Sequence, residues 1–480
     1  MKSKWLAFAG AVMAIFALVK STGARPMHFN APPTSTPTPS MTQAIRVNDF
    51  QMTQSVVTHH IQGQETTNAD INAINYLGVR GHREDATGDT NLQSDLCTIN
   101  SSTNDHAWLD LLPIYNATNE TIAQVQAMYD SVASCGLHAV EGPNEPNNFN
   151  FVYRDQACGP FDGGIMPSAG CAVFMADLYA MAHKDYKLAG IPVWGMTEVG
   201  SEGENEYLQD LKVPTGSHII VPDGTVYADA ANVHNYIGGN GNGLVIDNQV
   251  FWTESIPVTT AWQPDLFNEY WGNGTWNRNF PMELCTPPSY SNCQYNIHKV
   301  TTETGWGEAQ GTTAQQKQMG YMLADIYLQG VRMGFDATTI YRAFNTSGDN
   351  TEGMFNVNGD EADSGNALPA ANYIHNMNAI IHDTNSTFTP GTLNYSISGM
   401  PSTGYSLLME KGNGTWELAV WGESFSSNTS TSLTVNLGST FSTVSVYDVT
   451  SGTSPVQTHS NVSSVTLSIN QWPNIVEAHN

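Results

Sequence analysis

The chain has 480 residues, of which 44 are acidic and 17 are basic, so its formal net charge at neutral pH is −27. A field of this sign repels phosphate, which excludes nucleic acid and an anionic membrane surface as expected partners. A neutral substrate such as a glycan fits the charge better. Apolar residues make up 40% of the chain, enough to bury a large core, and the length predicts two domains.

The first segment, residues 1–24, has the pattern of a secretory signal peptide. A basic start is followed by an apolar run over residues 5–19, and small residues follow up to Ala24. The run is shorter than a typical membrane span, although an uncleaved anchor is the alternative interpretation. Residues 25–45 are rich in Pro and Thr, which predicts a linker. We therefore expect a secreted protein, extracellular or periplasmic, with no membrane association after signal cleavage.

The chain contains six cysteines, which are Cys97, Cys135, Cys158, Cys171, Cys285 and Cys293. An even number in an exported chain predicts disulfides, but sequence alone does not choose among the fifteen possible pairings. Short loops favour the pairs Cys158–Cys171 and Cys285–Cys293, which leaves Cys97 for Cys135. A zinc site is disfavoured because the chain has no C-x-x-C pair.

From about residue 54, short apolar runs alternate with stretches of helical periodicity. The runs that predict strands are residues 55–61, 76–83, 108–114, 137–142, 191–197, 230–238, 297–305 and 335–344. The stretches that predict helices include residues 122–136, 172–187, 314–334 and 370–383. Parallel strands need crossover helices, so the alternation predicts an α/β fold, a (β/α)₈ TIM barrel over residues 46–385. In that fold the working residues lie at the C-terminal ends of the strands.

After residue 386 the pattern changes to period-two alternation. The segment is rich in β-branched and aromatic residues separated by Gly, Ser and Asn turns. This predicts an antiparallel β-sandwich over residues 386–480. The sequence leaves open whether this domain binds glycan or packs against the barrel as a structural partner.

Two glutamates lie at predicted strand ends. Glu145 follows the fourth strand within the stiff turn GPNEP, residues 142–146, and Glu303 lies at the end of the seventh strand. Cleaving a glycosidic bond needs two carboxyl groups, one to protonate the leaving oxygen and one to attack the anomeric carbon or activate water. On facing strand ends of one barrel, these two side chains would stand close together.

Several segments resemble clan A retaining glycoside hydrolases of the family 39-like or family 5-like type. Residues 142–146 (GPNEP) resemble their strand-four motif, and residues 302–306 (TETGW) resemble their strand-seven nucleophile segment. Further resemblance to strands two, six and eight lies in residues 77–85 (LGVRGHRED), 232–239 (NVHNYIGG) and 340–345 (IYRAFN). The resemblance implies a barrel with a C-terminal sandwich, a carbohydrate substrate, no cofactor and no metal.

The resemblance also assigns roles to four residues at the first motifs. Glu145 would be the general acid/base and Glu303 the nucleophile. Asn144 would hydrogen-bond the sugar 2-hydroxyl. Arg83 would face Glu303 and keep it ionised, because a nearby cation favours the charged form of a carboxyl group.

The remaining candidates are ring-bearing residues. His234 and Tyr236 would contact the nucleophile or the bound sugar. Trp306 and Tyr341 are candidates for the floor of a sugar subsite, because the C–H face of a sugar packs on a ring. Tyr341 stands where many of these enzymes carry a Trp. A long segment before the seventh strand adds three further aromatic candidates, which are Trp252, Trp262 and Trp271.

Other titratable residues near the strand ends have simpler expectations. His59 and His60 are adjacent on the first strand and would point to opposite faces, so a metal shared between them is not expected. Glu141 is expected to form a structural ion pair or hydrogen bond.

The sequence therefore predicts a secreted, monomeric, retaining glycoside hydrolase that acts on a β-linked poly- or oligosaccharide through a covalent glycosyl-enzyme intermediate. A retaining mechanism predicts carboxyl groups about 5 Å apart. The alternatives are a non-catalytic carbohydrate-binding or cell-surface protein on a TIM-barrel scaffold, and a metal-dependent hydrolase, which the absence of an H-E-x-x-H motif disfavours.

Overall fold

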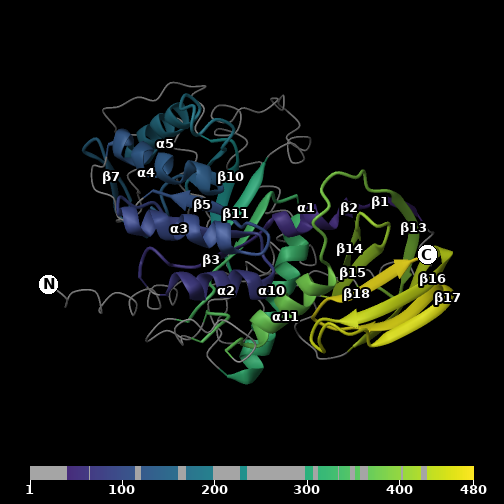
Figure 1. Cartoon of the computed structure of the whole chain (residues 1–480). Helices are drawn as coiled ribbons and strands as arrows, with labels where there is room; N and C mark the ends of the chain where they lie inside the picture. Colours follow the sequence, from purple (N-terminus) through teal and green to yellow (C-terminus); the bar gives the residue numbers. More distant parts are fainter. Residues whose placement is uncertain are drawn as a thin grey trace, which may run out of the picture.

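The computed structural model describes most of the two predicted domains. The described residues are 40–63, 65–113, 121–146, 148–159, 169–197, 228–234, 298–305, 312–332, 334–345, 352–356, 366–401, 404–422 and 430–480. They contain two eight-stranded sheets and one two-stranded hairpin. Figure 1 shows the second sheet beside helices α10 (Thr313–Arg332) and α11 (Pro369–Ile380) of the first domain.

The first sheet is a nearly closed barrel of parallel strands. Its order is β10-β11-β12-β3-β4-β5-β6-β9, so neighbours in the chain are neighbours in the sheet. The strands are β3 (Gln54–Val57), β4 (Gly81–Asp85), β5 (Trp108–Leu112), β6 (Leu137–Glu141), β9 (Val193–Trp194), β10 (Ala231–His234), β11 (Lys299–Thr304) and β12 (Ala337–Ile340). A parallel bridge between Trp194 and Ala230 joins the two ends of the sheet. Each of the eight predicted strands overlaps one of these, and the prediction of a TIM barrel is confirmed.

Among the described residues, helices follow six of the eight barrel strands, in the order that the alternation predicted. They are α2 (Thr67–Leu77), α3 (Thr90–Ser102), α4 (Ile122–Val132), α5 (Ala169–Ala182), α10 and α11, with a short α1 (Val47–Met52) before the first barrel strand. The prediction of a strand from residue 76 is wrong at its start. Tyr76 and Leu77 end α2, Gly78 terminates that helix in the left-handed region at φ 70°, and β4 begins only at Gly81.

Two disulfides lie in the barrel. Cys97 on α3 is bonded to Cys135, and Cys158 is bonded to Cys171 on α5. Cys158 belongs to a hairpin of β7 (Phe151–Tyr153) and β8 (Gln156–Cys158), which the sequence analysis did not predict. Both pairings match the expectation, and the predicted third pair, Cys285–Cys293, lies outside the described residues.

No helix within the described ranges is long and apolar enough to cross a membrane.

The second sheet is mostly antiparallel. Its order is β1 (Ser40–Gln43), β13 (Thr392–Ser398), β16 (Thr431–Asp448), β18 (Asn474–His479), β15 (Trp416–Gly422), β14 (Gly404–Glu410) and β2 (Ile45–Arg46), and β17 (Gln457–Ile469) also pairs with β16. The 18-residue β16 pairs with β13 along its first half and with β18 along its second half, and the sheet has its own apolar core. These features are consistent with the predicted sandwich.

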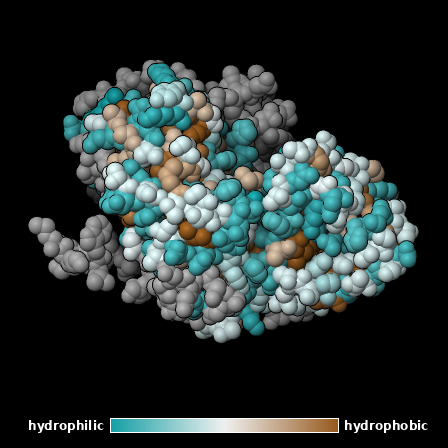
Figure 2. Space-filling view, viewed as in Figure 1, coloured by the Kyte–Doolittle hydropathy of each residue, from teal (hydrophilic) through white to brown (hydrophobic). Residues whose placement is uncertain are grey.

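The predicted linker differs from the structure at its C-terminal end. Ser40–Gln43 pairs with β13 and Ile45–Arg46 pairs with β14, so the last residues assigned to the linker are strands of the second sheet. The chain thus adds two edge strands to this sheet before it enters the barrel. On the face shown in Figure 2, hydrophilic and intermediate residues cover most of the described surface.

The end of β6 lies against the segment after β9. The Gly142 N–H donates to the Trp194 carbonyl at 3.0 Å, and a Cβ at Gly142 would lie 2.6 Å from the Met196 backbone N and 2.4 Å from the Met175 Sδ. Only glycine therefore fits where the chain leaves β6 toward Glu145.

We predict that Gly142→Ala lowers the free energy of unfolding by about 1–3 kcal/mol, because a methyl group overpacks this contact and the backbone cannot yield. The measurement is the midpoint of thermal unfolding. Gly88→Ala is the matched control, since its Cβ would have one neighbour within 4 Å, Met128 Cε at 3.9 Å. Equal midpoints for the two variants would contradict the prediction.

Candidate active site

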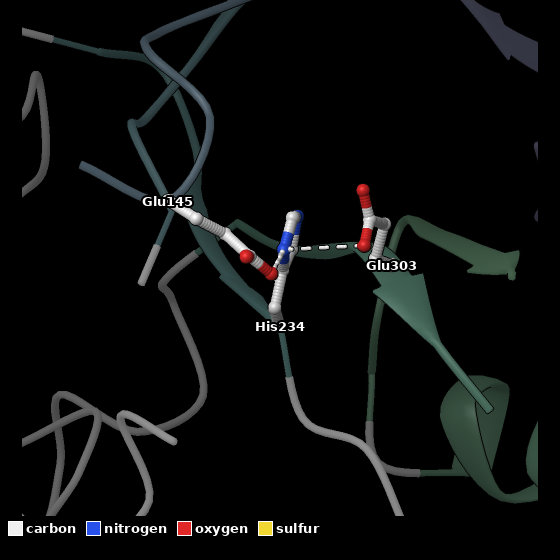
Figure 3. Close-up of side chains that lie close together, drawn as sticks. All are labelled: Glu145, His234 and Glu303. Atoms are coloured by element: carbon white, nitrogen blue, oxygen red, sulfur yellow. Dashed lines mark hydrogen bonds and ion pairs between the residues drawn. The ribbon is translucent and has the colours of Figure 1, made fainter. Parts of the chain in front are cut away.

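Polar side chains from several strands converge at the C-terminal end of the barrel. Arg83 lies in β4, Glu141 ends β6, His234 ends β10, and Glu303 lies near the end of β11. Glu145 lies four residues past the end of β6. Figure 3 shows the side chains of Glu145, His234 and Glu303 pointing toward one another from three separate segments of the chain.

Glu145 is held by its local backbone. Its φ is 42°, in the left-handed region that a non-glycine residue seldom adopts. The Glu145 N–H donates to Thr197 Oγ1 at 3.3 Å, and its carbonyl accepts from Asn148 N–H at 2.8 Å and Phe149 N–H at 2.9 Å. The residue is only 7% exposed, so it is not a solvated surface glutamate on a turn. An observed backbone outlier of this kind is typical of functional sites.

The two glutamates stand close together. His234 Nδ1 lies 2.7 Å from Glu145 Oε1 and 3.6 Å from Glu303 Oε2. One oxygen of each carboxyl group and this ring nitrogen all lie within 4.8 Å of one another. Both carboxyl groups therefore lie close enough to contact one bound group at the same time.

Arg83 is the cation of the site. It is 2% exposed, and its Nε and Nη2 both donate to the Glu141 carboxylate. Its Nη1 donates to Glu303 Oε1 at 2.7 Å and its Nη2 to Asn144 Oδ1 at 2.9 Å. The structure therefore brings Arg83, Asn144 and Glu303 together as the sequence predicted, and Glu141 forms the expected ion pair.

Burial and charge act against each other on this ion pair. Burial alone would raise the pKa of Glu141, but the Arg83 guanidinium, together with the neighbouring Asp110 and His234, holds that pKa below its usual range. Burial would lower the pKa of Arg83, but the charges of Glu141 and Glu303 raise it well above its usual range. On the neighbouring β5, burial and the Glu141 charge raise the pKa of Asp110 well above its usual range.

Two residues that the sequence analysis did not single out connect the parts of the site. Thr302 Oγ1 lies 3.1 Å from His234 Nε2 and 3.0 Å from Asn232 Oδ1. Asn232 Nδ2 donates to Glu141 Oε2 at 3.1 Å. Asn232 lies two residues before His234 on β10, so it shares that strand face, and Thr302 directly precedes Glu303. Their positions beside motif residues are the signal that sequence reasoning missed.

Tyr341 and His59 lie at the side of the site near Glu303. Their ring centroids are 5.2 Å apart in an edge-on arrangement. Burial first, and the Arg342 and Arg83 charges second, lower the pKa of His59 to about 4, while the Gln62 hydrogen bond and the Glu303 charge act in the opposite direction. Burial raises the pKa of Tyr341. A neutral ring pair therefore lies on the Glu303 side of the site.

His60 points away from this site, but the predicted reason is wrong, because β3 ends at Val57 and His59 has a φ of 61°, so neither histidine lies on the strand. Its Nδ1 lies 2.8 Å from Asp70 Oδ2 and its Nε2 lies 3.5 Å from Asp95 Oδ2. Within the described part of the chain, Glu145, His234 and Glu303 are the one group spaced closely enough to ligate a metal ion. The Arg83 charge at 2.7 Å from Glu303 opposes a cation there.

Several predicted contacts lie outside the described residues. They are Tyr236, Trp306, Trp252, Trp262 and Trp271. Their roles remain predictions from the sequence.

The comparisons with known proteins identify the class of fold. No family model and no curated protein matches the sequence. A family 39 glycoside hydrolase from Bacteroides cellulosilyticus WH2 is similar in structure, with a TM-score of 0.54, 13% identity, and coverage of 90% of this chain and 82% of that chain. A family 51 alpha-L-arabinofuranosidase from Bifidobacterium longum has a TM-score of 0.54 and 11% identity, and the match covers 92% of this chain and 98% of that chain. An endo-beta1,6-glucanase has a TM-score of 0.52 and 10% identity, and the match covers 95% of this chain and 97% of that chain.

These similarities extend over most of each chain and show a shared fold. The chain has the fold of clan A glycoside hydrolases, as its motifs led us to expect.

We predict that Arg83→Met lowers the free energy of unfolding at neutral pH by about 3–5 kcal/mol, because it leaves Glu141 buried without its counter-charge. The depressed pKa of Glu141 stabilises the fold above the ordinary value of 4.5, and this stabilisation is lost as pH falls through the lower folded value. The difference between wild type and variant should therefore shrink below about pH 4.5.

The measurement is the thermal unfolding midpoint of both proteins from neutral pH to about pH 3. The double variant Arg83→Met/Glu141→Gln is the control and should recover part of the loss at neutral pH. A difference that is independent of pH would refute this electrostatic account.

Proposed function

We propose that the protein is a secreted retaining glycoside hydrolase that cleaves O-glycosidic bonds of a β-linked poly- or oligosaccharide. The observation that carries the proposal is the approach of Glu145 and Glu303 to within 4.8 Å at the C-terminal end of the barrel. This spacing leaves room for an anomeric carbon and its leaving oxygen but not for an additional water between them.

The two glutamates have different neighbours, which supports different roles. Glu303 faces the Arg83 guanidinium, so it is the carboxylate that attacks the anomeric carbon. Glu145 faces His234 and accepts from Asn148 Nδ2 at 3.1 Å, so it is the group that protonates the leaving oxygen.

The reaction proceeds in two displacements. In the first, a Glu303 oxygen bonds to the anomeric carbon, the glycosidic C–O bond breaks, and the Glu145 proton passes to the leaving oxygen. In the second, the Glu145 carboxylate takes a proton from water, the water oxygen bonds to the anomeric carbon, and Glu303 leaves as a carboxylate. Both steps invert the carbon, so the configuration is retained overall.

Other residues would hold the sugar. Asn144 is proposed to hydrogen-bond the 2-hydroxyl, and Tyr341 borders the carboxyl groups where a ring would pack on the sugar. Tyr236 and Trp306 are proposed as further contacts on the motif resemblance.

The setting of the enzyme is also proposed. Residues 1–24 would be removed on export, residues 46–385 would form the catalytic domain, and residues 386–480 would form the accessory domain of a monomer. The two disulfides are compatible with an oxidising compartment.

We predict that wild-type protein hydrolyses at least one member of a panel of aryl β-glycosides and polysaccharides, and that Glu303→Gln reduces this to background. Glu145→Gln should reduce kcat/KM on substrates with poor leaving groups by about 10²–10⁴-fold and change kcat/KM much less on dinitrophenyl glycosides, whose leaving group needs no protonation. The kcat on dinitrophenyl glycosides should still fall, because Glu145 is the base of the second displacement. Rates are measured at saturating substrate, which gives kcat, and at limiting substrate, which gives kcat/KM.

The product configuration, followed by NMR in the first minutes, and the site labelled by a 2-fluoro glycoside provide the control. Retention and a glycosyl group on the peptide that contains Glu303 are expected. Inversion would overturn the mechanism, and glycan binding without hydrolysis would favour the non-catalytic carbohydrate-binding protein.

A further inference from the structure

The hydrogen bonds around Asn232 leave one orientation for its amide. The backbone N–H of Thr302 can only donate, and it lies 3.2 Å from Asn232 Oδ1. The other end of the amide, Nδ2, lies 3.1 Å from Glu141 Oε2 and 3.2 Å from the Gly195 carbonyl, which are both acceptors. Asn232 Oδ1 therefore faces Thr302 and can only accept.

This orientation fixes the next two groups. The Thr302 hydroxyl lies 3.0 Å from Asn232 Oδ1 and has a single hydrogen, which it donates to that oxygen. Its lone pairs then face His234 Nε2 at 3.1 Å, so the ring nitrogen is the donor and carries a hydrogen. In the neutral imidazole, Nδ1 then carries only a lone pair, and it points at Glu145 Oε1 from 2.7 Å.

We propose that Asn232 and Thr302 are positioning residues that fix His234 as its Nε2–H tautomer and thereby make Glu145 an effective proton donor. This inference rests on the proposed function. With this tautomer the Glu145–His234 contact holds one shared proton in the acid form of the site. After the proton has passed to the leaving group, the Nδ1 lone pair of His234 faces the Glu145 carboxylate. Glu145 and His234 therefore take up a proton readily when water attacks.

The opposite tautomer would work against catalysis. An Nδ1–H would donate to the Glu145 carboxylate and stabilise it, so that less of the enzyme would hold the proton to be donated. The charged groups that face this pair lie on three strands. They are Glu303 on β11, whose Oε2 lies 3.6 Å from His234 Nδ1, and Glu141 on β6 and Arg83 on β4, which lie behind Asn232. The substitution that tests the inference, Thr302→Val, leaves each of these three charged residues in place.

The test is Thr302→Val, which removes the hydroxyl and nearly preserves the shape of this fully buried side chain. We expect the alkaline limb of kcat/KM to move about one pH unit toward acid, the effect of one gained hydrogen bond to a charged group. At a pH on that limb, kcat/KM should fall about tenfold for a poor leaving group and less than about twofold for a dinitrophenyl glycoside. Misplacement of Glu303 would lower both rates.

Two variants serve as controls. Thr302→Ser keeps the hydroxyl and should restore the wild-type pH profile. Thr339→Val makes the same isosteric change at a buried threonine on β12, whose hydroxyl has no hydrogen-bond partner among the described residues, and should leave the profile unchanged. A Thr339→Val profile that shifts as far as that of Thr302→Val would overturn the inference, because the effect would then be a general one of lost hydroxyls.

A spectroscopic readout needs no substrate. In protein labelled with ¹⁵N-histidine, His234 should show a protonated Nε2 and an unprotonated Nδ1 above the alkaline limb, and Thr302→Val should shift the signal toward Nδ1–H. The His234→Gln spectrum identifies the signal. Wild-type protein with Nδ1–H at His234 would overturn the inference.

The outcomes separate the two proposals. If wild-type protein cleaves no glycoside, the proposed function fails. Wild-type activity that Glu303→Gln abolishes would support the proposed function. If Thr302→Val and Thr302→Ser then show the same alkaline limb in their pH profiles of kcat/KM, the positioning role fails and the proposed function stands.

Discussion

One buried guanidinium holds the site together. Arg83 on β4 contacts Glu141 at the end of β6, Asn144 in the turn beyond it, and Glu303 on β11. A carboxylate buried without a partner costs several kcal/mol, so the strands that carry the glutamates can converge only where β4 supplies a cation. The planar fork of arginine allows three partners to be bound at once in fixed directions, which the point charge of a lysine does not.

The site depends equally on the difference between its two ends. Glu303 has the cation as neighbour, whereas Glu145 has an imidazole and an amide. Two carboxyl groups this close in the same surroundings would share one proton between them, and neither would be set apart as the donor. The barrel produces the difference because each strand end contributes one neighbour, and the order of strands decides which neighbour each glutamate meets.

The sequence allowed the strands to be predicted because each buried run stands between polar or Gly-rich segments. The predicted strand start at residue 76 was wrong, because the end of α2 and the following strand form one apolar stretch in the sequence. Gly78, which terminates α2, is the residue that separates them. The glutamates were predictable from stiff motifs. Asn232 and Thr302 begin two of the motif segments, but their hydrogen-bond partners were not predictable, because the pairing of β10 with β11 sets them and a polar residue inside a strand does not reveal its partner.

The polar interior of this barrel is costly, and stability does not explain it. Replacing buried ion pairs with apolar residues of similar volume is often neutral or stabilising, so Arg83 and Glu141 contribute little that a leucine core would lack. They fix positions instead. Each bond from Arg83 through Glu141, Asn232 and Thr302 to His234 has a defined donor. The guanidinium can only donate, and the directions from Asn232 to His234 follow from one backbone N–H on β11. A network of this kind specifies where protons lie as well as where atoms lie, which is the property that proton transfer needs.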